Sequence, residues 1–323
     1  MNTNAHAVPG FSGAGYGHPP TTKRGVFFVS ILNAIIQGLI QGLTEFLPIS
    51  SSGHLSLFQY FTGQNSESSV MFSVMLHFGT LVAVFIAFWK TIRELIVEVF
   101  RMVQELFTRK RRTAGREMPP QRRMILMLFI SLLPLLFSVL FKHFFEGVAS
   151  DNDIILEGIG FLITAVLLTL SDKVVKGRKK AATMQVRDAV AIGVAQGIAP
   201  MSGISRSGST ISIGMLMGLD RSYAVAFSFI MGIPAVIGAN ILELVDVASG
   251  DVTVEWVPVI IGVIVAAVSG FFAIKMVHYF VKTDRFKYFA WYTLALGIVC
   301  IVIGIIELFF NRPVQQLISG MFA

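Results

Sequence analysis

Residues 41–54 read QGLTEFLPISSSGH and residues 196–210 read QGIAPMSGISRSGST, and both stretches have apolar sequence on either side. When residue n is placed over residue n+155, seven of the sixteen positions from 38 to 53 are identical, namely Gly38, Gln41, Gly42, Ile49, Ser50, Ser52 and Gly53. Clusters of Gly, Pro and Ser interrupt helices. The apolar pieces around each cluster are too short to cross about 30 Å of hydrocarbon twice, so regions 32–62 and 188–219 are predicted to be re-entrant helical hairpins.

The rest of the chain has the composition of a membrane protein. Of 323 residues, 54% are hydrophobic and 14% are charged, whereas soluble domains carry about 25% charged residues. Continuous apolar segments of about 20 residues predict membrane-crossing helices rather than the alternating strands of a barrel. Six spans are expected, at 70–89, 124–142, 153–171, 222–242, 256–275 and 288–309. We therefore predict an all-α polytopic membrane protein with six transmembrane helices and two re-entrant helix pairs.

The repeat also divides the chain into parts. Residues 1–25 are rich in Gly, Pro, Ser and Thr without apolar periodicity, which predicts a disordered N-terminal tail. Residues 26–310 are predicted to form a single integral membrane domain, with repeat one at about 32–171 and repeat two at about 188–309, followed by a C-terminal tail at 311–323. Each repeat is one hairpin followed by three spans. Because three is odd, the second copy enters the membrane from the opposite face, which is an inverted-topology repeat.

Basic loops predict the orientation. The loops 90–123 and 172–187 contain ten and six Lys or Arg residues, and five more flank the later spans. These 21 residues are expected to be cytoplasmic, which leaves only Lys23, Arg24, Lys142 and Arg312 outside and makes both termini extracytoplasmic. The amphipathic segment 90–112 is expected to lie on the membrane surface. Such loops also account for the net charge of +7, so nucleic acid is not expected as a partner.

Each break precedes a helical half that begins with serine and glycine. Serines at such positions cap free N–H groups, and an exposed helix N-terminus of this composition also binds anions. Arg206 lies at membrane depth, where an arginine costs at least about 2.5 to 3.5 kcal/mol. Two interpretations are open for it: an internal ion pair with Glu45, or a guanidinium fork that grips phosphate oxygens. Both interpretations can be true of the protein without substrate.

Glu45 is the only carboxylate in either break, where it could hold a divalent cation or accept a proton. His54 comes three residues after Ser51, so the hydroxyl and the imidazole are predicted to share one helix face as an activated nucleophile. His77 lies within a span and is predicted to be a hydrogen-bonded structural residue, and Cys300 a packing residue. This set suits phosphoryl transfer, which requires mainly positioning and charge neutralisation.

These residues resemble the bacterial undecaprenyl-diphosphate phosphatases linked to bacitracin resistance, over about residues 30–310. Gln41-x-x-x-Glu45 and SSSGH at 50–54 are similar to the family's E/Q-x-x-x-E and SS-[ST]-GH elements, and GISRSGSTIS at 203–212 is similar to its P-G-x-S-R-S-G element. The resemblance implies six spans plus two re-entrant pairs in the cytoplasmic (inner) membrane, with a cavity that opens to the extracytoplasmic side. It also implies hydrolysis of the C55 isoprenyl diphosphate to the monophosphate carrier lipid of peptidoglycan synthesis.

The same resemblance implies roles for individual residues. The implied catalytic set is Glu45, Ser51, His54 and Arg206, with either Ser51 or His54 as the nucleophile. A divalent cation, Mg²⁺ or Ca²⁺, is implied as cofactor, with Glu45 as its ligand. The residues expected around the diphosphate are Gln41, Ser50, Ser52, Gly53, Ser205, Ser207, Gly208 and Thr210. The expected partners are the polyprenyl diphosphate substrate and membrane lipid. A homodimer is the candidate assembly.

Two departures from the family's pattern and two other functions stay open. Gln41 stands where many members have Glu, and Ser202 replaces a proline. Ser52-Gly53-His54 also resembles an element of phosphatidic-acid-phosphatase-type membrane enzymes, which have a second histidine soon after their S-R pair, but none follows Arg206 before His278. The inverted repeat favours a carrier or flippase for anionic polyprenyl lipids. Glu45 together with His54 favours an enzyme.

Overall fold

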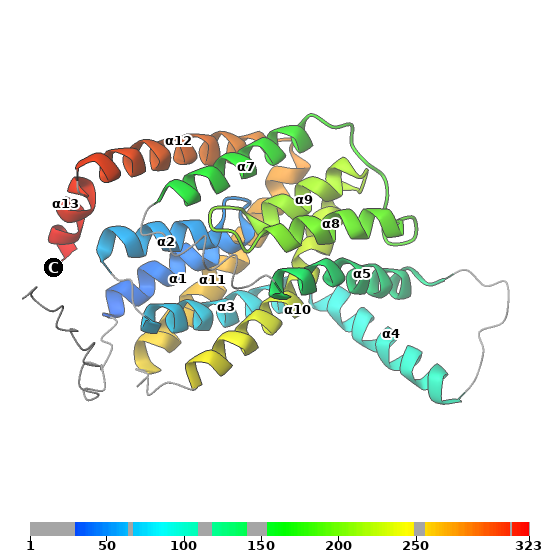
Figure 1. Ribbon diagram of the computed structural model, residues 1–323. Helices are drawn as coiled ribbons and strands as arrows, with labels where there is room; N and C mark the ends of the chain where they lie inside the picture. The colour runs from blue at the N-terminus through cyan, green and yellow to red at the C-terminus, as the bar shows by residue number, and fades with distance from the viewer. Residues whose placement is uncertain are drawn as a thin grey trace, which may run out of the picture.

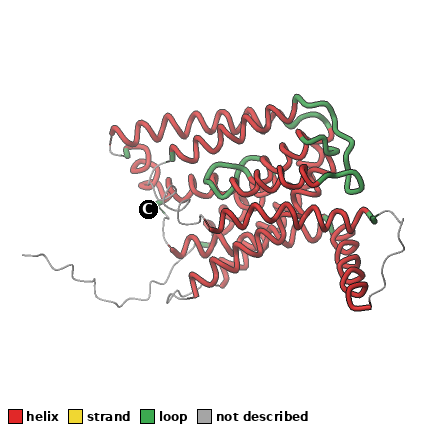
Figure 2. The backbone as a smooth tube through the Cα atoms, turned by 45° about the vertical axis from the view of Figure 1, so that its right-hand side comes forward, coloured by secondary structure: helices red, strands yellow, loops and turns green. Residues whose placement is uncertain are grey.

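The computed structural model of the protein describes residues 30–63, 67–108, 118–140, 154–248, 256–310 and 312–322. Twelve helices and no named strand fall within these ranges. Most of the helices run side by side in one bundle, with loops at its two ends (Figure 1; Figure 2). The described part of the chain is therefore all-helical, as the composition predicts. The predicted disordered tail at 1–25 lies outside the described residues.

Both predicted hairpins are pairs of short helices. The first break is flanked by α1 (Ile31–Phe46) and α2 (Ser51–Thr62), and the second by α8 (Val186–Ile198) and α9 (Arg206–Leu216). α1 has 16 residues, which is about 24 Å of helix, and the other three are shorter. None reaches the roughly 20 residues that a membrane span requires. Within each pair the two helices contact each other.

Seven helices are longer than those of the hairpins. Their bounds are α3 (Glu67–Ala87), α4 (Trp89–Thr108), α5 (Pro120–Leu140), α7 (Ile155–Asp172), α10 (Arg221–Ala248), α11 (Trp256–Lys282) and α12 (Lys287–Phe310). Among the described residues, α7, part of α10, α11 and α12 are each long and apolar enough to cross a membrane, and a fifth span results if the bent pair α3 and α4 is counted as one. Large apolar side chains such as Phe272 and Trp291 are exposed on their outer faces. The protein is a polytopic helical membrane protein.

A sharp bend separates α3 from α4. The two helices differ in direction by 86°, and α4 leaves the bundle as an arm (Figure 2). Phe100 and Phe107 are exposed on α4. On its polar side, Glu98 and Glu105 pair with Arg122 of α5, at 2.7 Å and 2.8 Å. The predicted span at 70–89 therefore ends at this bend, and the predicted surface helix corresponds to α4.

The segment predicted as a C-terminal tail contains a further helix, α13 (Pro313–Phe322), which packs against α2. The backbone N–H of Gln315 donates to the buried carboxylate of Glu307 on α12, at 2.8 Å. The Gln315 side chain donates to the carbonyl of Tyr60 on α2, and the Tyr60 hydroxyl donates to the other oxygen of Glu307. The end of the chain thus joins α2 to α12.

The two hairpins pack on their neighbours in equivalent ways. α1 lies along α11, and α8 lies along α5. A Cβ atom at Gly38 would lie 2.6 Å from the carbonyl oxygen of Gly262, and one at Gly193 would lie 2.5 Å from the carbonyl oxygen of Ser131. Only glycine permits helices to approach this closely. Close helix packing therefore explains why both of these repeat-related positions are glycine.

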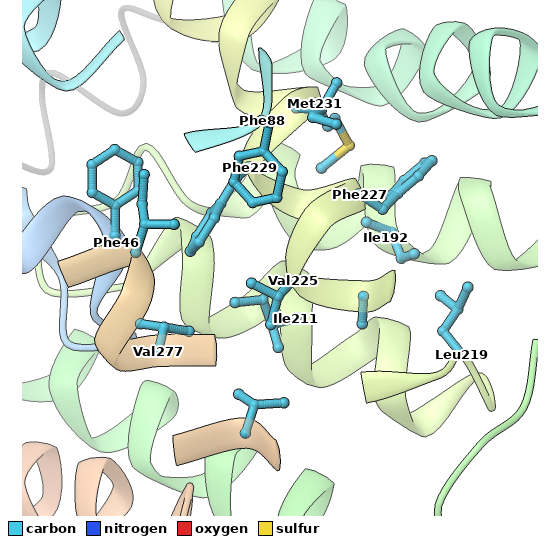
Figure 3. Close-up of a cluster of buried hydrophobic side chains, with 14 of the residues drawn as sticks. Phe46, Phe88, Ile192, Ile211, Leu219, Val225, Phe227, Phe229, Met231 and Val277 are labelled. Atoms are coloured by element: carbon cyan, nitrogen blue, oxygen red, sulfur yellow. The ribbon is translucent and has the colours of Figure 1, made fainter. Parts of the chain in front are cut away.

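The main hydrophobic core lies between the two hairpins. It includes Phe46 of α1, Ile192 of α8, Ile211 of α9 and Val277 of α11 (Figure 3). Phe46 meets Phe229 of α10 edge to face, with ring centroids 5.2 Å apart, which is a favoured aromatic geometry. Because one core holds elements of both hairpins, it fixes the two breaks relative to each other.

The three basic segments of the sequence meet at one end of the bundle. Arg123 Nε donates to the carbonyl of Met184 at 2.8 Å, which links the first basic loop to the second. Lys176 Nζ and Arg221 Nη1 lie 2.7 Å from opposite oxygens of Asp284, which links the second to the third. The hydrogen bond from Lys176 holds the pKa of Asp284 below its ordinary value. A common end for all three is what the positive-inside rule requires.

Candidate functional site

The N-termini of α2 and α9 have the same capping geometry. Ser50 Oγ accepts the backbone N–H of Gly53 at 3.2 Å, and Ser205 Oγ accepts that of Gly208 at 2.9 Å. In both copies the capping hydroxyl also lies 3.3 Å from the serine hydroxyl two residues later. The predicted capping role of these serines is therefore confirmed.

Glu45 joins the two hairpins. The residue is 7% exposed. Its Oε2 accepts hydrogen bonds from Gln41 Nε2 at 3.0 Å and from the Ser51 hydroxyl at 2.6 Å, and its Oε1 accepts one from Arg206 Nη2 at 2.6 Å. Charge-assisted hydrogen bonds of this length are strong. The predicted ion pair between Glu45 and Arg206 is therefore present, and Ser51 and Arg206, which the repeat relates, bind opposite oxygens of one carboxylate.

The guanidinium of Arg206 is seated against α10. A Cβ atom at Gly232 would lie 2.1 Å from Arg206 Nη1, so the guanidinium fills the space that a side chain would take. Nη1 is buried and has no hydrogen-bond partner in the part of the chain that is described. One amino group is thus held by Glu45, while the other is a buried donor that an additional anion would satisfy.

His54 does not pair with Ser51, which corrects the predicted hydroxyl–imidazole pair. Its Nδ1 lies 2.7 Å from the carbonyl oxygen of Ser50, which only accepts, so Nδ1 carries the hydrogen. In the neutral ring Nε2 then accepts, and the hydroxyl of Tyr292 on α12 donates to it at 2.7 Å. The two rings are stacked, 5.7 Å apart at 10°. Ser51 instead donates to Glu45, which places a carboxylate where an imidazole is predicted.

His77 takes part in the site, which the sequence does not indicate. Its Nδ1 donates to the carbonyl of Ser73 at 2.8 Å, as expected of a structural histidine within a helix. Its Nε2, however, lies 3.8 Å from Glu45 Oε2. A second imidazole therefore borders the carboxylate that holds Ser51 and Arg206.

The other predicted residues of the second hairpin lie at its contacts with the rest of the bundle. Ser207 Oγ donates to the carbonyl of Leu47 at 3.3 Å, which joins the second break to the first. A Cβ atom at Gly208 would lie 3.3 Å from Pro48. The Thr210 hydroxyl lies 2.6 Å from that of Ser228 on α10. Ser207 and Gly208 thus hold the two breaks together and Thr210 joins α9 to α10, while Ser52 is exposed.

A family model described as bacitracin resistance protein BacA matches residues 34–299, most of the chain. The chain belongs to this family. The matched region covers both breaks and the residues that hydrogen-bond or pair with Glu45.

Curated relatives agree with the BacA match over nearly their whole length. A protein of Halothermothrix orenii is 39% identical over 278 residues, which are 85% of this chain and 99% of the relative. Proteins of Methanosphaera stadtmanae and Alkaliphilus metalliredigens are 36% and 35% identical over 86% of this chain. All three are named undecaprenyl-diphosphatase.

The structure accounts for both positions at which this chain departs from the BacA pattern. The Nε2 of Gln41 donates to Glu45, a contact that a second carboxylate could make only if it were protonated. The hydroxyl of Ser202 donates to Glu157 of α7 at 3.0 Å. The sequence does hold a signal for Glu157, since a carboxylate within a predicted span is a functional candidate. No signal near Tyr292 marks it as a neighbour of His54.

The described residues offer few ligands for a resident metal. No group of three or more His, Cys, Asp or Glu side chains lies close enough to share an ion anywhere in the described ranges. Glu45 supplies one carboxylate, and the buried Oε1 of Gln41 has no hydrogen-bond partner there. A Mg²⁺ ion is often held by one or two carboxylates together with waters and substrate phosphates. The donor set therefore fits a cation shared with a phosphate ligand.

Proposed function

We propose that this protein hydrolyses undecaprenyl diphosphate to undecaprenyl phosphate and inorganic phosphate, which recycles the carrier lipid of peptidoglycan synthesis. The observation that carries the proposal is the convergence of Ser51 and Arg206 on Glu45, in a chain whose curated relatives are named undecaprenyl-diphosphatase. The pair supplies a hydroxyl and a phosphate-binding cation at one place. These are the components that phosphoryl transfer requires.

Ser51 is the proposed nucleophile, with Glu45 as its base. The Ser51 oxygen attacks the terminal phosphorus, and its proton passes to Glu45 Oε2, which already accepts that hydrogen bond. The bond between this phosphorus and the bridging oxygen breaks, which releases undecaprenyl phosphate. The unsatisfied Nη1 of Arg206 donates to a phosphate oxygen as charge develops.

His54 is the proposed base for the second step. Its Nε2 has the lone pair because Nδ1 is held as the donor to Ser50, and the Tyr292 hydroxyl that donates to this lone pair turns away before Nε2 acts as a base. Nε2 then accepts a proton from the water that attacks the phosphoserine, the bond between phosphorus and the Ser51 oxygen breaks, and Glu45 returns its proton to that oxygen as inorganic phosphate leaves. The proposal that Ser51 and His54 act in different steps fits their separate hydrogen-bond partners.

A divalent cation is proposed to arrive with the substrate. Glu45 and the Oε1 of Gln41 would hold it from the protein side. When bound, Mg²⁺ or Ca²⁺ supplies neutralisation of the charge on the diphosphate.

The proposed membrane topology has six spans, formed by α3, α5, α7, α10, α11 and α12, with α1/α2 and α8/α9 as re-entrant pairs of an inverted repeat. Two observations support it: the hairpin helices are too short to span, and the basic loops meet at one end. That end is proposed to be cytoplasmic, in the inner membrane, with the site open to the other side. The homodimer stays a prediction.

Phosphate release from a polyprenyl diphosphate by the purified protein in detergent tests the proposal. Phosphate release is expected in the presence of Mg²⁺ or Ca²⁺. It should fall when a chelator is added and return when the cation is restored. A carrier would move the labelled lipid across proteoliposomes without releasing phosphate. Absence of release under all these conditions would overturn the proposed function.

A further inference from the structure

A second buried carboxylate lies beside the site but contacts none of its reacting groups. Glu157 of α7 is 7% exposed, and no ion pair involves it within the described ranges. Its Oε1 accepts hydrogen bonds from the Ser56 hydroxyl at 2.8 Å and from the Ser202 hydroxyl at 3.0 Å. A buried carboxylate without a cation is costly in a membrane protein and calls for a specific role.

The two serines belong to the two hairpins. Ser56 lies on α2, two residues after His54. Ser202 lies in the break between α8 and α9, four residues before Arg206. One oxygen of Glu157 therefore connects the helix that carries the histidine to the loop that leads into Arg206, the first residue of α9 (the Arg206 loop).

The backbone of α7 grips the same loop. Gly203 has φ +80°, and a Cβ atom there would lie 2.2 Å from the carbonyl oxygen of Glu157. A Cβ atom at Gly160 would lie 2.3 Å from the carbonyl oxygen of Ser202. One turn further on, the Thr164 hydroxyl accepts the backbone N–H of Ser205 at 3.0 Å and donates to the carbonyl of Gly203 at 3.3 Å. α7 thus holds the loop over three successive turns.

We propose that Glu157 is a positioning residue of the phosphatase site, which sets the distance between α2 and the Arg206 loop by accepting hydrogen bonds from Ser56 and Ser202. The inference rests on the proposed function. What matters is the acceptor oxygen rather than the charge, because both hydrogen bonds end on Oε1 while Oε2 is buried without a partner in the described chain. Misplacement of catalytic groups by about 1 Å can cost 100-fold in rate.

Three variants separate the acceptor from the charge and from packing. Glu157→Gln keeps an acceptor oxygen and is expected to retain most of the turnover number. Glu157→Leu keeps the volume without an acceptor and is expected to lower kcat at least about 10-fold, because the Arg206 loop then shifts relative to α2. Ser202→Ala is expected to lower kcat in the same direction, and to add little to Glu157→Leu.

The matched control is Glu307→Leu, which removes another buried bridging carboxylate, one that ties α12 to α13 and α2 away from the breaks. It is expected to lower the unfolding temperature and leave kcat per folded molecule unchanged. Wild-type kcat in a folded Glu157→Leu protein, or an equal loss in Glu157→Gln and Glu157→Leu, would overturn the inference. Lack of phosphate release by the wild type would instead overturn the proposed function, so the two failures are distinguishable.

Discussion

The two hairpins have the same scaffold and different chemistry. Both pack by a glycine on a neighbouring helix, and both begin their second helix with a serine cap and a second serine 3.3 Å away. The positions proposed to react are among those that differ. Glu45 aligns with Pro200, and Ser51 aligns with Arg206.

Backbone conformation also differs between the copies. Ser50 has φ +72°, in the left-handed region that side chains seldom adopt, whereas the aligned Ser205 has φ −74°. Strain of this kind is found where the surrounding structure fixes a residue for function. The first hairpin, which carries the proposed nucleophile and base, is therefore the strained copy, and the second presents Arg206 directly after an unstrained serine.

The largest effect is expected from Glu45→Gln, which removes the proposed base and the ion partner of Arg206 together. Turnover should fall by on the order of 1,000-fold, as for loss of a general base. Phosphate release by the folded variant measures it. Pro200→Ala, at the aligned position of the other hairpin, is the control and should leave turnover nearly unchanged. Equal losses in both variants would mean that the two hairpins contribute alike.

Arg206→Lys keeps the positive charge but loses the paired N–H donors of the guanidinium. A single ammonium cannot hold Glu45 and also donate from the position of Nη1, so turnover should fall by about 100-fold. The control is Arg122→Lys, which weakens another arginine–carboxylate pair outside the site. Near-normal phosphate release by Arg206→Lys would show that the arginine is structural.

A smaller loss, of about 10-fold in kcat, is expected from Tyr292→Phe, since one hydrogen bond to His54 Nε2 disappears while the stacked ring remains. Tyr288→Phe, on the same helix, is the matched control. If Tyr292 acts through His54, the change should add nothing in a His54→Ala background. Independent, additive losses would contradict that coupling.

The smallest effect is expected at the two helix caps, Ser50 and Ser205. Ser50→Gly and Ser205→Gly remove equivalent hydroxyls, but only Ser50→Gly relieves a positive φ. The free energy of unfolding of Ser50→Gly should therefore be about 1 kcal/mol higher than that of Ser205→Gly. Thermal unfolding of the two variants in the same detergent measures the difference. A lower unfolding temperature for Ser50→Gly would mean that the position is not strained.

Much of this arrangement follows from sequence because the repeat provides long-range information. The 155-residue offset places Ser51 and Arg206 at equivalent hairpin tips, and the cost of a membrane-embedded arginine calls for a carboxylate partner, which is Glu45. The hairpin ends agree with the Gly, Pro and Ser clusters because these residues stop helices locally.

Contacts between unrelated helices could not be predicted in this way. Tyr292 meets His54 across 238 positions, and no local pattern encodes the rotation of α12 that brings it there. His77 follows the local rule for a helical histidine at Nδ1, while its Nε2 is placed by tertiary packing. The pairing of Ser51 with Glu45 rather than His54 also depends on side-chain direction, since spacing on a helix gives the face but not the hydrogen-bond partner.

The contact between Arg206 and Gly232 has a consequence for protein engineering. The cation is presented by α9, but the space it occupies belongs to α10, where even a methyl group would meet Nη1. Grafting the two breaks onto another helical scaffold would therefore fail unless the recipient also has a gap at the matching height of a helix equivalent to α10. The unit that can be transferred is the two hairpins together with α10, including the space beside Gly232.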